Sequence, residues 1–168
     1  MYYGFMLKEK LQADVKDALK SGNSQKRTLL GMVLSSIKNR EFDKRGKLSK
    51  TESDPVKIEE MMKLNDEEVL ETIGSEIKKR KDSVEQFQKG GRPELAEQEQ
   101  REIEMLMAYM PEQMSEEAIR EEVKKAIAES GVTDIKEMGK VLGTLMPKVK
   151  GKADGSLVSR LVKEELSK

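Results

Sequence analysis

The sequence contains no cysteine and no histidine. Without cysteine the chain can form no disulfide, thiolate nucleophile or thiolate-bound metal site. Without histidine it lacks the commonest general base and the commonest metal ligand, so Ser-His-Asp and Cys-His catalytic arrangements are excluded. We therefore expect no cofactor, no bound metal and no catalytic site of its own.

Aromatic residues and long apolar runs are also scarce. Aromatics make up 4% of the chain, whereas charged residues make up 38%. No apolar run approaches the roughly 20 residues that span a bilayer. The start, MYYGFMLKEK, lacks the basic segment and the apolar segment of a secretory signal. We expect a cytoplasmic protein with no membrane partner.

What remains is typical of helices. Apolar residues recur at helical spacing, and Ser21-Gly22, Gly90-Gly91, Pro111 and Gly131 separate the runs. Asn65 with Glu68 forms the pattern of a capping box. The stretch 46–65 lacks this spacing and predicts a mobile connection with one short turn at 58–64. The expected helices cover about residues 7–20, 24–45, 66–89, 93–110, 115–129, 134–146 and 155–167.

These elements predict an all-α fold with two helical domains. Residues 1–111 would form an N-terminal helical domain, in which 66–89 and 93–110 make a long antiparallel hairpin. Residues 112–168 would form a small C-terminal three-helix domain.

The segment LMPKVKGKADGSLVSRLV, residues 145–162, has features that a hydrophobic core does not need. Pro147 should end the preceding helix and leave 147–152 extended, with Lys148, Lys150 and Lys152 on one side. Gly151 permits a bend, and Asp154 can cap the next helix. That helix presents a polar stripe of Ser156, Arg160 and Lys163.

Charge is concentrated around this segment. The whole chain is balanced, with 32 basic and 32 acidic residues. Residues 136–163 hold seven basic and two acidic residues, a net +5, which leaves −5 for the rest. A local basic patch favours an anionic partner such as RNA, and a solvated loop is an equally good alternative. The candidate RNA-binding residues are Lys140, Lys148, Lys150, Lys152, Ser156, Arg160 and Lys163.

Three further patterns have both a functional and a structural interpretation. Gly139, Gly143 and Gly151 could allow close contact with a sugar-phosphate backbone. For Gly139 and Gly143, tight packing against a neighbouring helix is the favoured alternative. The run KKRK, residues 78–81, has acidic neighbours at helical spacing and predicts a solvated face. Glu67, Glu68 and Glu71 lack a second set of ligands and predict no metal site.

Three stretches together carry a resemblance: KKRKDSVEQFQKGGRPELAEQEQREIEML (78–106), YMPEQMSEEAI (109–119) and MGKVLGTLMPKVKGKADGSLVSRLVKEEL (138–166). They resemble the YqeY proteins, also called the GatB/YqeY family, and residues 6–45 extend the resemblance over nearly the whole chain. The segment 46–64 departs from it, being longer and more polar than the usual connection.

The resemblance implies a C-terminal part similar to the tail of GatB, a subunit of the amidotransferase that corrects mischarged tRNA. It implies tRNA as a partner, with a protein of the aminoacyl-tRNA pathway as another, and a carbon–nitrogen ligase label (glutamine as amide donor) inherited from GatB. The expected function is an accessory tRNA-binding module linked to tRNA-dependent amidation. The alternative is a non-catalytic protein–protein interaction module, and a ligase in its own right is disfavoured by the residues that are absent.

The domain boundary predicts how a fragment of about residues 112–168 behaves. Its three apolar faces can bury one another without the N-terminal part, so we expect it to fold alone, with the low stability of a small core. Circular dichroism of the purified fragment should show a helical signal that is lost cooperatively on heating. A fragment without helical signal would contradict the boundary.

Overall fold

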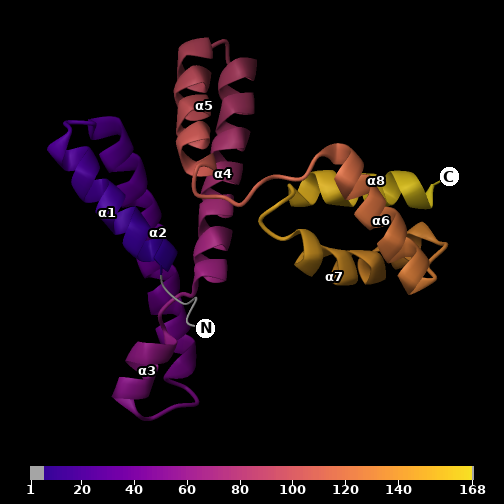
Figure 1. The fold of residues 1–168 in the computed structure, drawn as a ribbon, viewed down its shortest axis with the longest axis horizontal. Helices are drawn as coiled ribbons and strands as arrows, with labels where there is room; N and C mark the ends of the chain where they lie inside the picture. The colour runs from indigo at the N-terminus through magenta and orange to yellow at the C-terminus, as the bar shows by residue number, and fades with distance from the viewer. Residues whose placement is uncertain (1–5, 168) are drawn as a thin grey trace. The chain divides into compact units, whose positions relative to one another are not determined.

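The structure is a computed structural model of the chain and describes residues 6–167. Residues 1–5 and residue 168 lie outside this range. The prediction that MYYGFMLKEK is not a secretory signal therefore falls partly outside the described residues. From 6 to 167 all regular structure is helical, which confirms the all-α prediction (Figure 1). Contacts divide the chain into two compact units, Met1–Tyr109 and Met110–Lys168. Independent folding of two domains stays a prediction.

The first unit begins with a helical hairpin. The helix α1 spans Met6–Lys20 and α2 spans Ser24–Leu48, and the two pack along their length. Asn23 caps α2 by accepting a hydrogen bond from the Lys26 N–H. The turn between them matches the sequence prediction.

The connection that follows is more ordered than the sequence indicated. The α2 helix continues past Gly46, and a further helix, α3, spans Pro55–Met61. Asp54 caps α3, whose first residue is a proline, a favourable start for a helix. Leu64 is only 2% exposed, and its N–H donates to buried Glu41 at 3.3 Å. The prediction of a connection with one short turn at 58–64 was therefore wrong for residues 46–48 and 55–61, which are helical, and the rest of 46–65 lies outside helices.

The helices α4, Asp66–Lys89, and α5, Pro93–Met107, form the predicted antiparallel hairpin (Figure 1). The capping box is confirmed, because the Asn65 side chain accepts from the Glu68 N–H and Glu68 accepts from the Asn65 N–H, each at 2.9 Å. Helix α5 ends three residues earlier than predicted. Tyr109 follows it and donates its hydroxyl hydrogen bond to Asp14 of α1. Burial and this bond raise the pKa of Tyr109, so the phenol stays protonated.

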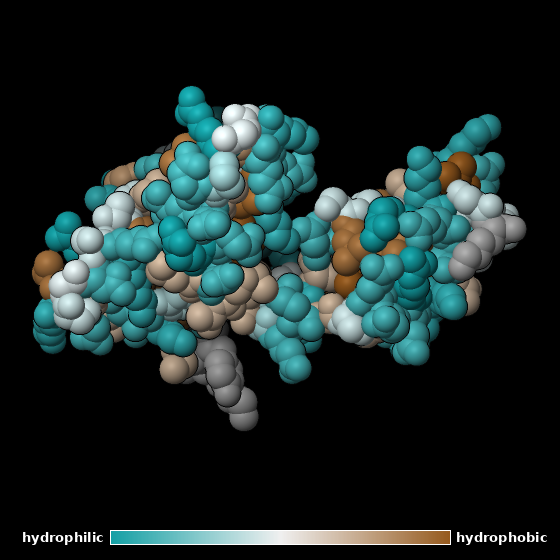
Figure 2. Space-filling view, turned by 90° about the horizontal axis from the view of Figure 1, so that it is seen from above, coloured by the Kyte–Doolittle hydropathy of each residue, from teal (hydrophilic) through white to brown (hydrophobic). Residues whose placement is uncertain are grey.

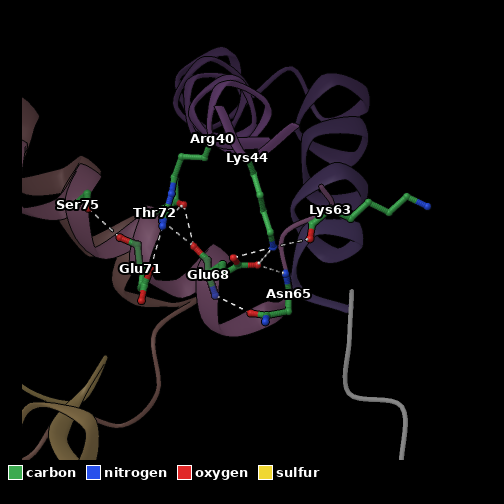
Figure 3. A network of polar contacts seen from close by, with 8 residues as sticks. All are labelled: Arg40, Lys44, Lys63, Asn65, Glu68, Glu71, Thr72 and Ser75. Atoms are coloured by element: carbon green, nitrogen blue, oxygen red, sulfur yellow. Dashed lines mark hydrogen bonds and ion pairs between the residues drawn. The ribbon is translucent and has the colours of Figure 1, made fainter. Parts of the chain in front are cut away.

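A polar network joins α2 to the first turns of α4 (Figure 3). The Arg40 guanidinium donates to the Glu68 carbonyl at 3.0 Å, to Thr72 Oγ1 at 2.8 Å and to Glu71 at 2.9 Å. Lys44 donates to the Glu68 carboxylate at 2.8 Å. Burial alone would raise the pKa of Glu68, but the bonds from Lys44 and the Asn65 N–H hold it below its ordinary value. These contacts fix the register of α2 on α4.

A second network corrects the prediction for KKRK. Arg80 is 6% exposed and donates to Glu76 at 2.9 Å and to Glu102 of α5 at 3.0 Å. Ser36 of α2 donates to the same Glu76 at 3.1 Å. Burial opposes the charge on Glu76, yet hydrogen bonds from Lys79 and Arg80 lower its pKa below the ordinary value. Arg80 therefore joins α4 to α5 instead of facing solvent, and Glu76 extends the network to α2. The three lysines of KKRK are exposed, as predicted.

The second unit consists of three short helices around their own core. Ser115 caps α6, Glu116–Ser130, and Gly131, at φ +64°, ends it as predicted. A 3-10 turn, Ile135–Glu137, leads into α7, Met138–Val149, and α8 spans Gly155–Leu166. The buried core residues are Ile119, Val123, Ala126, Val132, Val141, Leu145, Val149, Val158, Leu161 and Val162.

The buried guanidinium predicts a large effect of mutation. Arg80→Ala would leave Glu76 and Glu102 without their shared partner in a poorly solvated place, so it should lower the free energy of unfolding by about 3–5 kcal/mol. Lys78→Ala, on the exposed side of the same helix, should change it by less than about 0.5 kcal/mol. Urea unfolding of both variants would compare them, and equal effects would show that Arg80 is not buried in solution.

Candidate nucleic-acid interface

The main correction to the predicted interface concerns Pro147, because α7 does not end there. The helix continues to Val149 with the proline in its last turn. Proline at 147 removes only the bond from its own nitrogen to the carbonyl of residue 143. Burial of Val149, 1% exposed, continues the stripe of Val141 and Leu145 at four-residue spacing and holds the last turn in place. That spacing was the signal in the sequence for the longer helix.

The three lysines consequently do not lie on one side of an extended strand. Lys148 lies on α7, Lys150 follows it at φ −56° and ψ 127°, and Lys152 lies in the turn after that. Gly151 turns the chain at φ +73°, and the Lys152 N–H returns to the Val149 carbonyl at 3.0 Å. We call residues 150–154, which join α7 to α8, the basic corner.

The beginning of the second unit is bound to this corner. The Met114 N–H donates to the Lys152 carbonyl at 2.8 Å. The Gln113 side chain donates to the Gly151 carbonyl, also at 2.8 Å. A Cβ on Gly151 would lie 3.6 Å from the Pro111 ring, an ordinary contact distance. The corner is thus a defined turn, with contacts that the sequence pattern did not reveal.

Asp154 caps α8 as predicted. Its carboxylate accepts from the Ser156 N–H at 2.9 Å and also from the Ser156 hydroxyl. A negative group therefore already occupies the position where the helix N-terminus would attract an anion. Ser156 is exposed, but its hydroxyl is used within the cap, so the end of α8 contributes little to anion binding.

All seven predicted RNA-binding side chains are exposed, but they do not form a single cluster. Lys148 pairs with Glu129 at 3.0 Å, and Arg160 lies 3.6 Å from Glu116. These two acids lie at opposite ends of α6, about 20 Å apart along its axis. Lys140 pairs with Glu137 at 3.0 Å, and Lys150 also interacts within the chain. Lys152 and Lys163 have no ion pair with another residue in the range 6–167.

The two α7 glycines lie on an open surface. A Cβ added to Gly139 or Gly143 would meet no atom within 4 Å, so the favoured interpretation of tight helix packing was wrong. Met146 and Ile135, each 38% exposed, belong to the same unit, and a Cβ on Gly155 would lie 3.4 Å from the end of Met146. The face of the molecule in Figure 2 is mainly hydrophilic, with hydrophobic side chains in small patches.

Residues 6–167 contain no group of three or more acidic side chains placed to hold a metal ion. Glu68 and Glu71, which the sequence analysis set aside as ligands, are bound to Lys44 and Arg40. In the same range no helix has both the length and the apolar character needed to cross a bilayer.

Comparison with known proteins identifies a family and relatives that match most of the chain. A family described as Yqey-like protein matches residues 8–166. The chain is 30% identical to "Altered inheritance of mitochondria protein 41, mitochondrial" of Pyrenophora tritici-repentis over 159 residues, covering 92% of this chain and 78% of that protein. The protein of the same name from Lachancea thermotolerans is 34% identical over 101 residues, covering 60% and 46%.

The names of these relatives contradict the expected cytoplasmic location. A third relative, from Clavispora lusitaniae, has the same mitochondrial name and is 30% identical over 134 residues, 79% of this chain and 68% of that protein. The expectation rested on the missing secretory signal, which says nothing about other compartments. The relatives are instead named as mitochondrial proteins.

The open surface of α7 predicts that a side chain at position 143 is tolerated. Gly143→Ala should raise the free energy of unfolding by about 0.5–1 kcal/mol, because alanine favours the helix and no neighbour is displaced. Gly151→Ala should lower it by about 1–2 kcal/mol, because its φ of +73° disfavours a Cβ. Thermal unfolding of both variants provides the comparison. Destabilisation by Gly143→Ala would mean that another surface covers the glycine.

Proposed function

The chain belongs to the YqeY-like protein family, and from that premise we propose that it is an accessory tRNA-binding protein without a catalytic site of its own. The second unit would bind the sugar-phosphate backbone, in keeping with its resemblance to the tail of GatB. A link to tRNA-dependent amidation, with glutamine as amide donor, would then be through the tRNA that the protein holds.

The observation that carries this proposal is the exposed surface of α7 and the basic corner. Gly139 and Gly143 leave the helix backbone uncovered, so a sugar-phosphate chain can approach closely. Lys152 and Lys163 are exposed and make no ion pair within residues 6–167, which leaves them available to phosphates. Phosphate contacts position a nucleic acid without reading its sequence, so the proposed binding is not specific for one tRNA.

Protein–protein interaction is the second candidate, and the ion pairs favour it. Lys148 and Arg160 are already paired with acids of α6, which reduces the positive charge offered to RNA. Exposed Ile135 and Met146 add apolar area to the same unit. An apolar partner helix could lie against α7, because the two glycines leave room for it.

Salt dependence separates the two candidates. Each phosphate contact contributes about 0.7–0.9 to the slope of log affinity against log salt, so replacing Lys150, Lys152 and Lys163 by alanine should reduce the slope by about 2–3. Filter binding of tRNA at several salt concentrations measures this slope. The loss should be similar for different tRNAs.

A matched control removes the same charge elsewhere. Lys47, Lys50 and Lys57 are exposed lysines of the first unit, and their combined replacement by alanine should leave the slope unchanged. If wild type and the Lys150, Lys152 and Lys163 variant bind with equal affinity and slope, neither the basic corner nor Lys163 contacts RNA. The protein-interaction function then becomes the better explanation.

A further inference from the structure

The turn that joins α1 to α2 forms the free end of the first hairpin (Figure 1). We call residues 16–27, with sequence KDALKSGNSQKR, the hairpin tip. The Ser21 N–H donates to the Asp17 carbonyl and the Asn23 N–H to the Ala18 carbonyl, each at 2.9 Å. Gly22, at φ +71°, closes the turn. The tip is therefore a rigid structure that holds the last turn of α1 beside the first turn of α2.

The tip is basic, and its charges are largely unpaired. It contains Lys16, Lys20, Lys26 and Arg27 with a single acid, Asp17, a net +3. Lys20 and Asp17 are 3.8 Å apart and 80% and 73% exposed, so they attract each other weakly. The side chains of Lys16, Lys26 and Arg27 make no hydrogen bond or ion pair within the described part of the chain. In this respect the tip differs from the second unit, where Lys140, Lys148 and Arg160 all have acidic partners.

An apolar side chain lies among these charges. Leu19 is 60% exposed, although α1 has a buried face that holds Leu11 and Ala18. It shares one side of the last turn with Lys16 and Lys20, because the three residues have i, i+3 and i+4 spacing. An exposed leucine adds nothing to binding of phosphates, but it can enter the apolar layer of a bilayer while neighbouring lysines contact the headgroups.

The flank of the tip toward α5 is polar and hollowed. A cavity of about 430 Å³ is lined there by Ser24, Gln25, Thr28, Gln98, Arg101 and Glu102. Arg101 pairs weakly with exposed Glu97 of its own helix at 3.9 Å, and Glu102 is held by buried Arg80 at 3.0 Å. The nearby α1 acid Asp14 is bound to Tyr109. Asp14 and Glu102 are thus engaged within the protein, and the tip keeps its net charge of +3.

We propose that the hairpin tip binds an anionic lipid surface, with Leu19 entering the interface and Lys16, Lys20, Lys26 and Arg27 contacting the headgroups. Such binding needs no spanning segment, so it differs from the expectation of no membrane partner, which rested on the missing apolar run. The tip belongs to the first unit, and the proposal is independent of RNA binding by the second.

Vesicle sedimentation of the full chain tests the proposal. The chain should partition onto vesicles of phosphatidylcholine with about one-third phosphatidylglycerol and not onto phosphatidylcholine alone, because a basic residue near an anionic surface contributes about fivefold. Replacing Lys16, Lys20, Lys26 and Arg27 together by glutamine should lower partitioning by more than about 100-fold. Leu19→Ser keeps the charge and should lower it by about tenfold. Raising the salt should weaken wild-type binding.

Two controls make the outcome decisive. A control variant removes the same charge from the same unit by replacing Lys47, Lys50, Lys57 and Lys63 together by glutamine. Its partitioning onto vesicles should stay within about twofold of wild type. Circular dichroism should show that every variant keeps its helical signal, and tRNA binding by the hairpin-tip variant should equal that of wild type. Equal losses from the two fourfold variants, no partitioning of wild type, or an unchanged Leu19→Ser variant would overturn the proposal. If the fourfold hairpin-tip variant lost tRNA binding but kept vesicle binding, the tip would be a nucleic-acid site and the lipid proposal would be wrong.

Discussion

The first unit depends on charged groups buried between its helices. Arg80 binds Glu76 of its own helix and Glu102 of α5, while Ser36 of α2 reaches the same Glu76. The same helices bury leucine, isoleucine and valine side chains, among them Leu30, Ile37 and Ile73, and the ion pairs lie between the same helices. No polar side-chain atom buried in the described residues lacks a partner. Because a buried pair tolerates little misalignment, these bonds specify how the helices align along one another.

Local signals predicted the helices well, because glycines, prolines and capping residues act within a few positions of the chain. Asn65 with Glu68, and Gly131 after α6, ended or began helices where the pattern indicated. The prediction that Pro147 ends its helix was wrong, because it considered only the local effect of the proline. Its local effect was outweighed by burial of Val149 in a core built from α6 and α8. The helix α3 was predicted only as a short turn at 58–64, because seven residues give too short a periodic pattern, although Asp54-Pro55 is a recognisable start.

Burial and pairing of charged side chains could not be predicted from neighbouring residues alone. Arg80 has acidic residues at helical spacing, which favoured an exposed face, but its second partner, Glu102, comes from another helix 22 residues away. Lys148 and Glu129 are 19 residues apart and pair through the packing of α6 against α7. Counting charge along 136–163 therefore overstated the free positive charge of the second unit. The sequence analysis did not single out residues 16–27, because their net charge of +3 is smaller than the +5 of residues 136–163. The difference disappears only when the cations paired with acids are left out of the count.

A very short segment of the chain joins the two units, and its length affects how weak contacts combine. Tyr109 is held to α1 through Asp14, and Gln113 is held to the α7–α8 turn, so only three residues, 110–112, connect fixed points. Such a segment extends no further than about 14 Å. Two binding surfaces on so short a tether strengthen attachment to a partner that both can contact at once, and they gain nothing where the shape of that partner forbids simultaneous contact. Contacts too weak to persist alone can thus combine into a long-lived attachment, in which release requires both to open within the same brief interval.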